Sequence, residues 1–174
     1  MEALKAQAVA ARTLAVYKIQ KSSCDKSSNA HVCSDSRHCQ AWRSIDELKD
    51  GWGSKFDEKY DRLKKSVNDT KGIIMTWKDK PIQVFFYSTS NGWTEDASAA
   101  FSNSLPYYKV VASPGEENAP RYYGSVTMTT QKFIDSFKKR YPNANLNKSN
   151  LQSSIKIMGR TEGNRVDDIK IDGV

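Results

Sequence analysis

The chain has 174 residues, a mean hydropathy of −0.69 and a formal net charge of +7, which predict one soluble domain covering residues 1–174. No apolar run is long enough to cross a bilayer, and no signal peptide is visible. The basic charge favours a polyanionic partner, such as nucleic acid, an anionic membrane surface or an acidic wall polymer. The cations are scattered and accompany no nucleic-acid motif, which argues against nucleic acid.

The N-terminal region predicts a long helix followed by a long loop. Residues 2–20 are rich in alanine, with Leu4, Ala8, Ala11 and Ala15 on one stripe. Only Met1 precedes this helix, as expected for a chain that lacks an upstream segment. From residue 21 to residue 42 the sequence is polar, and a loop of this length needs something to hold it.

The rest of the chain predicts shorter helices and hairpins. We expect a helix at 55–69, two strands within 73–90 joined at Asp79-Lys80, a polar loop, a strand at 107–113, a helix capped by Thr129 or Thr130, and a final hairpin of 154–159 with 165–172. Helices and hairpins without a βαβ rhythm indicate an α+β fold, with antiparallel hairpins packed on helices and a substrate groove lined by loops.

The polar loop holds every cysteine and histidine of the chain. Its sequence "CDKSSNAHVCSDSRHC" runs from residue 24 to residue 39. Tetrahedral zinc binds such mixtures, and one structural ion would fix the loop, with Cys33 and Cys39 as the surest ligands. The alternative is a Cys33–Cys39 disulfide that leaves Cys24 free.

Two charged residues of the first helix have ordinary explanations. Glu2 lies in the first turn, where a carboxylate interacts favourably with the helix dipole by about 0.3–1 kcal/mol. Arg12 points to a different side of the helix from Glu2 by the helical angle, and we expect it to form a structural salt bridge.

Several segments together resemble one family. The stretches "EALKAQAVAART" (2–13), "KGIIMTWKDKPIQVFFYSTSNGWTE" (71–95) and "LPYYKVVASP" (105–114) are similar to segments of the SpoIID family, stage II sporulation protein D of endospore-forming bacteria. The stretch "HVCSDSRHCQAW" (31–42) resembles the zinc-containing version of clostridial members. The resemblance extends from residue 2 to the last hairpin.

The resemblance implies a peptidoglycan lytic transglycosylase. Such an enzyme cleaves glycan strands stripped of stem peptides, between N-acetylmuramic acid and N-acetylglucosamine, and leaves 1,6-anhydro ends during engulfment of the forespore. It implies that Glu2 is the catalytic acid. The substrate-binding residues that it implies are Ser88, Ser90, Thr94, Glu95, Tyr107 and Lys109. One zinc ion, held by Cys33, Cys39, His38 and His31, would have a structural role, and Cys24 or a water is the alternative to His31 as fourth ligand.

The resemblance also implies a setting for the protein. The family works between the mother-cell and forespore membranes, outside the cytoplasm, beside an amidase/endopeptidase that removes stem peptides. Its membrane anchor and N-terminal segment are absent from this chain. An alternative from the same family is a non-catalytic glycan-binding modifier that activates a wall amidase, and a weaker one is a zinc-stapled interaction domain.

The chemistry fits a single carboxylate. Ordinary glycosidases need two, whereas in a lytic transglycosylase the C6 hydroxyl of muramic acid attacks the anomeric carbon. One Glu protonates the glycosidic oxygen and then takes the hydroxyl proton. A general acid at neutral pH needs surroundings that favour its protonated form, so we expect Glu2 to be buried against aromatic side chains. Glu95 is the expected second carboxylate if the enzyme is hydrolytic.

Overall fold

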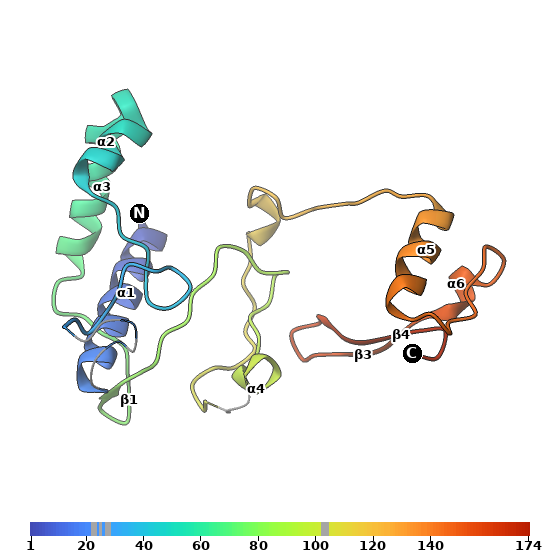
Figure 1. Cartoon of the computed structure of the whole chain (residues 1–174). Helices are drawn as coiled ribbons and strands as arrows, with labels where there is room; N and C mark the ends of the chain where they lie inside the picture. Colours follow the sequence, from blue (N-terminus) through green and yellow to red (C-terminus); the bar gives the residue numbers. More distant parts are fainter. Residues whose placement is uncertain (22–23, 25, 27–28, 102–104) are drawn as a thin grey trace. The chain divides into compact units, whose positions relative to one another are not determined.

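The computed structural model describes residues 1–21, 24, 26, 29–101 and 105–174 (Figure 1). The chain divides into two compact units, Met1–Phe86 and Tyr87–Val174. Helices and short antiparallel hairpins make up both units, which confirms the predicted α+β class. A single domain over residues 1–174 stays a prediction. None of the described helices is long and apolar enough to span a bilayer.

The first unit begins with the predicted alanine-rich helix, α1 (Glu2–Gln20). A small apolar core joins α1 to the chain that follows α3, and its members are Ala10, Leu14, Val84, Met75 and Ile82. Between them Thr13 is fully buried. Its hydroxyl donates to the Val9 carbonyl at 2.7 Å and accepts the Met75 N–H at 2.9 Å, so no polar group of this side chain is left unpaired.

A helix that the sequence analysis missed follows the polar loop. It is α2 (Ile45–Trp52), and it leads through the 3-10 turn η1 (Gly53–Lys55) into α3 (Phe56–Asp69). A capping box starts α2: the Ser44 hydroxyl accepts the Glu47 N–H at 3.1 Å, and the Glu47 carboxylate accepts the Ser44 N–H at 2.7 Å. The spacing Ser44-x-x-Glu47 is the signal that could have predicted this helix.

Arg12 fixes α1 to the end of α3. Its guanidinium donates to the carbonyls of Thr70 and Ile73 at 2.7 and 2.8 Å and, more weakly, to the Val67 carbonyl at 3.3 Å. These carbonyls lie at and just after the C-terminus of α3, where backbone oxygens lack helical partners. Arg12 therefore caps α3, and this role replaces the salt bridge that we expected for it.

The predicted hairpin at 73–90 is much shorter than expected. Its strands are β1 (Thr76–Trp77) and β2 (Lys80–Pro81), paired antiparallel. Lys78 and Asp79 form the turn with φ of 50° and 61°, the backbone of a two-residue hairpin loop. Pro81 has no N–H to extend the ladder, and the Ile82 N–H donates to the Met75 carbonyl at 3.3 Å.

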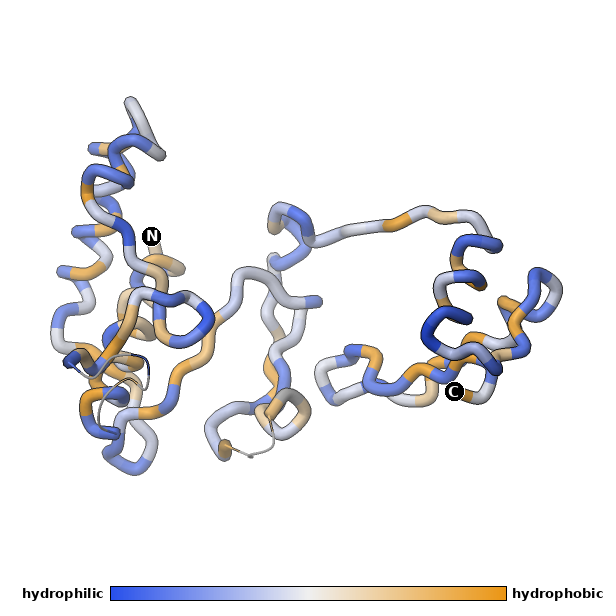
Figure 2. Tube along the Cα trace, viewed as in Figure 1, coloured by the Kyte–Doolittle hydropathy of each residue, from blue (hydrophilic) through white to orange (hydrophobic). Residues whose placement is uncertain are grey.

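The second unit contains the predicted helix and final hairpin. The elements are α4 (Ala97–Ala100), η2 (Glu116–Asn118), α5 (Thr130–Arg140), α6 (Leu151–Ser154), β3 (Ile155–Arg160) and β4 (Val166–Ile171). Thr129 caps α5 by accepting the Lys132 N–H at 3.2 Å, as predicted. Hydrophobic and hydrophilic residues alternate along α3 and α5 (Figure 2), as in amphipathic helices. The predicted strand at 107–113 contributes only an isolated bridge between Trp93 and Ala112.

Candidate functional site

Three thiols and one imidazole converge in the loop after α1. The Nδ1 atom of His38 lies 3.2 Å from the Sγ of Cys24 and 3.4 Å from the Sγ atoms of Cys33 and Cys39. The Sγ atoms of Cys24 and Cys39 are 3.8 Å apart, and both of these side chains are buried. None of the three cysteines is in a disulfide. We call these four residues the Cys3His cluster.

Backbone turns and an aspartate hold the loop in this form. The N–H groups of His38 and Cys39 bond to the Asp35 carbonyl at 3.0 and 2.8 Å. The Asp35 carboxylate accepts the Arg37 N–H at 2.9 Å and pairs with Lys26 at 2.9 Å. Hydrogen bonds from Arg37 and Lys26 keep the pKa of Asp35 well below its usual range, so it stays charged and continues to order the turn.

The donor set fits a tetrahedral metal ion. With Zn–S bonds of about 2.3 Å, tetrahedral geometry separates two sulfur ligands by about 3.8 Å, which is the distance between the Cys24 and Cys39 sulfurs. All four donor atoms lie within 4.8 Å of one another. The hydrogen bond with His38 lowers the pKa of Cys33 to about 6, which favours the thiolate that a metal needs. Burial raises the pKa of Cys24, and a cation among the sulfurs would offset that effect.

The cluster differs by one residue from the predicted ligand set. Cys33, Cys39 and His38 are brought together as expected, and Cys24 is the fourth member. His31 is exposed and lies outside the cluster. The structure thus favours Cys24 among the alternatives that the sequence left open.

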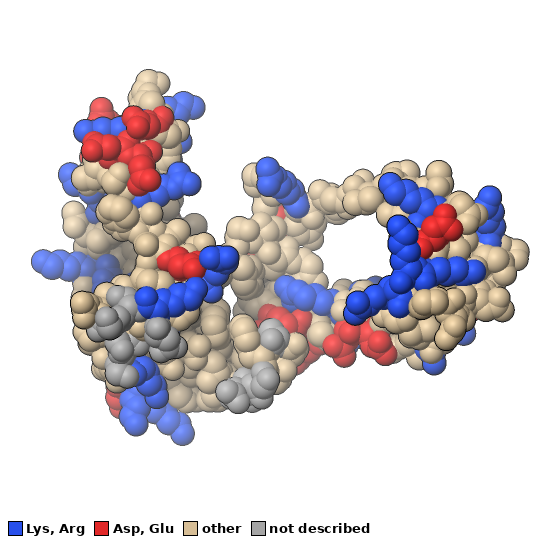
Figure 3. All heavy atoms as spheres, viewed as in Figure 1, with Lys and Arg blue, Asp and Glu red and all other residues tan. Residues whose placement is uncertain are grey.

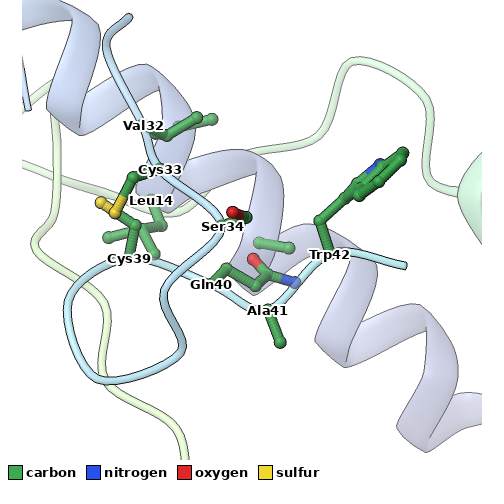
Figure 4. A pocket seen from close by; sticks show the side chains of 10 residues that line it. Leu14, Val32, Cys33, Ser34, Cys39, Gln40, Ala41 and Trp42 are labelled. Carbon is green, nitrogen blue, oxygen red and sulfur yellow. The ribbon is translucent and has the colours of Figure 1, made fainter. Parts of the chain in front are cut away.

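An apolar pocket of about 370 Å³ adjoins the cluster (Figure 4). One wall is α1, through Ala11, Leu14 and Ala15, and the other is the loop from Val32 to Trp42. Cys33 and Cys39 belong to the loop wall, so the Cys3His cluster holds the loop segment that lines the pocket. Trp42 also lines the pocket and is 71% exposed to solvent.

Glu2 lies in the first turn of α1 and is open to solvent. Its side chain is 86% exposed, and one carboxylate oxygen is 3.3 Å from the Lys5 ammonium. Lys5 also pairs with Asp69 at 3.2 Å, and hydrogen bonds with Asp69 and Glu2 raise the pKa of Lys5. The aromatic burial expected for Glu2 is absent among the described residues.

The predicted substrate-binding residues lie in the second unit, where Glu95 is the best-connected of them. Its carboxylate accepts the Thr161 hydroxyl at 2.6 Å, the Arg165 guanidinium at 3.0 Å and the Gly163 N–H at 3.3 Å. Burial opposes the charge, but these hydrogen bonds outweigh it and lower the pKa of Glu95. A side chain at Gly163 would meet the Glu95 carboxylate at 2.7 Å, so this contact needs glycine. Glu95 is therefore a charged acceptor that organises its own unit.

The other predicted residues of this unit have local partners. Lys109 pairs with Asp96 at 2.7 Å, and the Thr94 hydroxyl donates to the Lys109 carbonyl at 2.7 Å. Ser90 is buried and accepts the Gly92 N–H at 3.1 Å. Ser88 is exposed, and the Tyr107 ring lies 5.1 Å from that of Tyr108. Thr94, Lys109 and Asp96 thus form one connected group. Ser90 stabilises the turn at residues 90–92, which precedes Thr94 in the chain.

The fold and the cluster define a class: α+β proteins whose N-terminal helix is followed by a loop fit to bind a metal. Comparison with known proteins is more specific. Residues 1–77 match the family model described as SpoIID, Stage II sporulation protein. The chain is 35% identical over 173 residues, 99% of its length, to Stage II sporulation protein D of Bacillus subtilis (strain 168). It is 37% identical over 132 residues, 76% of its length, to the protein of that name from Bacillus amyloliquefaciens.

These matches support the SpoIID family for this chain, as its motifs predicted. The matched regions cover 48% and 38% of the two relatives, so the chain spans about half of their length or less. The family model covers α1, the Cys3His cluster, α2 and α3. Glu2 and the cluster therefore both lie in the segment that carries the family pattern.

Proposed function

We propose that this chain is the catalytic part of a SpoIID-type lytic transglycosylase, which acts on denuded peptidoglycan during engulfment in sporulation. The observation that carries the proposal is the position of Glu2, at the head of α1 and inside the segment matched by the family model. The 86% exposure of its side chain leaves it accessible to a polymer as large as a glycan strand.

The reaction needs one carboxyl group at the bond between N-acetylmuramic acid and N-acetylglucosamine. Glu2 donates its proton to the glycosidic oxygen as the bond to the anomeric carbon breaks. The carboxylate that results takes the proton of the muramic C6 hydroxyl, whose oxygen attacks the same anomeric carbon. The products are a 1,6-anhydro end and a free 4-hydroxyl, no water is consumed, and Glu2 is again protonated.

Glu2 must leave its ion pair to act on a bound glycan. The Lys5 ammonium pairs with the Glu2 carboxylate at 3.3 Å. Because Asp69 also holds Lys5, at 3.2 Å, the ammonium keeps one partner when the glycan separates it from Glu2.

Digestion of denuded glycan in water enriched in oxygen-18 tests the reaction type. Mass spectrometry of the products should give 1,6-anhydro muramic ends without the heavy label. A heavy oxygen at new reducing ends would contradict the proposal and indicate a hydrolase.

The second candidate function is a non-catalytic glycan-binding modifier that activates a wall amidase. The 86% exposure of the Glu2 side chain favours it, since the carboxyl group is open to solvent and lies against none of the described aromatic side chains. An amidase assay with and without this chain separates the two functions. Faster release of stem peptides, together with intact glycan strands, would favour the modifier.

The Cys3His cluster would hold one structural zinc ion, as in the zinc-containing clostridial type. The support is its donor set of three sulfurs and one imidazole nitrogen at tetrahedral separations. Zinc would cross-link the loop to itself beside α1, and it would supply no step of the reaction. Elemental analysis of the purified protein tests this assignment.

The remaining parts of the proposal concern the setting. We place the protein outside the cytoplasm, between the mother-cell and forespore membranes, anchored through a segment outside this chain. An amidase/endopeptidase of the engulfment machinery is the expected partner because the substrate must first lose its stem peptides. Cell fractionation of sporulating cells with an antibody to this chain tests the location.

A further inference from the structure

The start of α1 and the α2–α3 junction form an open depression of about 270 Å³. Its five lining residues are Leu4, Trp52, Lys59, Arg62 and Leu63. Leu4 lies in the same first turn of α1 as Glu2, so the depression is at the end of α1 that carries the proposed acid. We call these five residues the Trp52 depression.

The lining combines apolar surface with positive charge. Leu4, Leu63 and Trp52 are each partly buried and supply apolar surface. The Lys59 ammonium lies 5.4 Å from the centre of the Trp52 ring, which keeps a cation at the edge of that surface. None of the five lining residues is acidic.

The second cation is weakly engaged. Arg62 is 4.0 Å from Glu58, and the two side chains are 53% and 71% exposed. A pair with this geometry contributes little, because solvent screens it. A carboxylate of a ligand could therefore bind the Arg62 guanidinium without breaking a strong internal contact.

The neighbouring side chains hold Trp52 in place. The Trp52 and Phe56 ring centres are 6.2 Å apart, and Phe56 stacks on Tyr60 at 5.1 Å. A row of packed rings loses little conformational freedom when a ligand binds, which favours recognition. Lys and Arg lie among Asp and Glu over α2 and α3 (Figure 3), whereas none of the five lining residues is acidic.

We propose that the Trp52 depression is a subsite for one carboxylate-bearing sugar of the glycan strand. The inference rests on the proposed function and extends it. Small-molecule sites usually have about 300–1,000 Å³, so this volume suits a single sugar of a longer ligand. The apolar surface packs on the sugar ring and its acetyl group, while Lys59 and Arg62 bind the carboxylate. In denuded peptidoglycan the lactyl group of N-acetylmuramic acid supplies that carboxylate.

Binding measurements test the subsite separately from cleavage. The probes are denuded glycan strands and the same strands with their lactyl carboxylates reduced to alcohols. All proteins carry Glu2→Gln, so that the strands stay intact. The test variant adds Lys59→Gln and Arg62→Gln, and the matched control adds Lys71→Gln and Lys78→Gln, which removes two exposed lysines elsewhere in the same unit.

The test variant should bind unmodified strands about tenfold more weakly than its parent, and the control should bind like the parent. On reduced strands, parent and test variant should bind alike. Equal binding of unmodified strands by parent and test variant, or the same loss on reduced strands, would overturn the subsite. Trp52→Ala should weaken binding to both kinds of strand, and Trp52→Phe should restore part of it. Cleavage is measured separately with the unsubstituted chain. If that chain leaves the glycan intact while the Glu2→Gln proteins show the charge-dependent binding, the transglycosylase is overturned and the subsite stands.

Discussion

The sulfurs of Cys24 and Cys39 lie 3.8 Å apart in the interior of a polar loop, fifteen residues apart in the chain. This distance is too long for a disulfide and matches two ligands of one tetrahedral metal ion. Cys24, whose role the sequence left open, is therefore a member of the Cys3His cluster.

Replacing Cys24 should impair metal binding, whereas replacing His31 should not. Cys24→Ser removes one of the four convergent donors, and we expect zinc affinity to fall more than about 100-fold. His31→Gln changes an exposed residue outside the cluster and is the matched control. Competition with a chromophoric chelator gives both affinities. Equal loss in the two variants would contradict the cluster.

Chelation of the metal should lower the midpoint of thermal unfolding. The ion binds the folded loop and not the unfolded one, so its removal loses the stabilisation by mass action. The midpoint should return when zinc is added back. A midpoint that does not change, in a protein without bound metal, would favour the disulfide alternative.

Arg12→Ala should lower the free energy of unfolding of the first unit by roughly 2 kcal/mol. The substitution removes the charged donor that bonds to the Thr70 and Ile73 carbonyls at 2.7 and 2.8 Å. Arg12→Lys should recover only part of this, since one ammonium cannot reproduce the fork of the guanidinium. Urea unfolding measures the free energies. Arg43→Ala, at an exposed position, is the control and should be close to neutral.

Ser44→Ala should lower the free energy of unfolding by about 1 kcal/mol through loss of the cap of α2. Ser54→Ala, at an exposed serine of η1, should change it little. Urea unfolding with circular dichroism measures both. Equal effects of the two substitutions would contradict the capping role.

Acid should destabilise the second unit through Glu95. The pKa of Glu95 is lowered in the folded state from its ordinary value of 4.5. A carboxyl of this kind stabilises the fold above its unfolded pKa, and that stability is lost as pH falls through the folded pKa. The free energy of unfolding should therefore fall below about pH 4.5. Glu95→Gln should reduce this pH dependence, while Asp168→Asn, at an exposed acid of β4, should preserve it.

Local sequence signals predicted the elements that depend on them. The alanine-rich stretch predicted the bounds of α1, a cap at Thr129 or Thr130 predicted the start of α5, and the paired stretches 154–159 and 165–172 predicted the final hairpin. The prediction of a strand at 107–113 was wrong. Strand formation depends on a pairing partner, and among the described residues this segment forms an isolated bridge, between Trp93 and Ala112.

The site was predictable in composition but not in geometry. Spacing grouped Cys33, His38 and Cys39, but it could not tell whether Cys24 or His31 folds back onto them. That choice depends on the turn around Asp35 and on the bond from the Cys24 N–H to the Ala30 carbonyl. The Glu2–Lys5 pair is a local contact between residues three apart on α1. The Lys5–Asp69 pair joins α1 to α3, and no local pattern encodes it.

The central claim concerns the carboxyl group of Glu2, and the most direct test counts new 1,6-anhydro ends released from denuded glycan. The unsubstituted chain should release them, Glu2→Gln should release fewer by more than about 100-fold, and Glu117→Gln, at an exposed acid of η2, should match the unsubstituted chain. Equal release by Glu2→Gln and the unsubstituted chain would contradict the account.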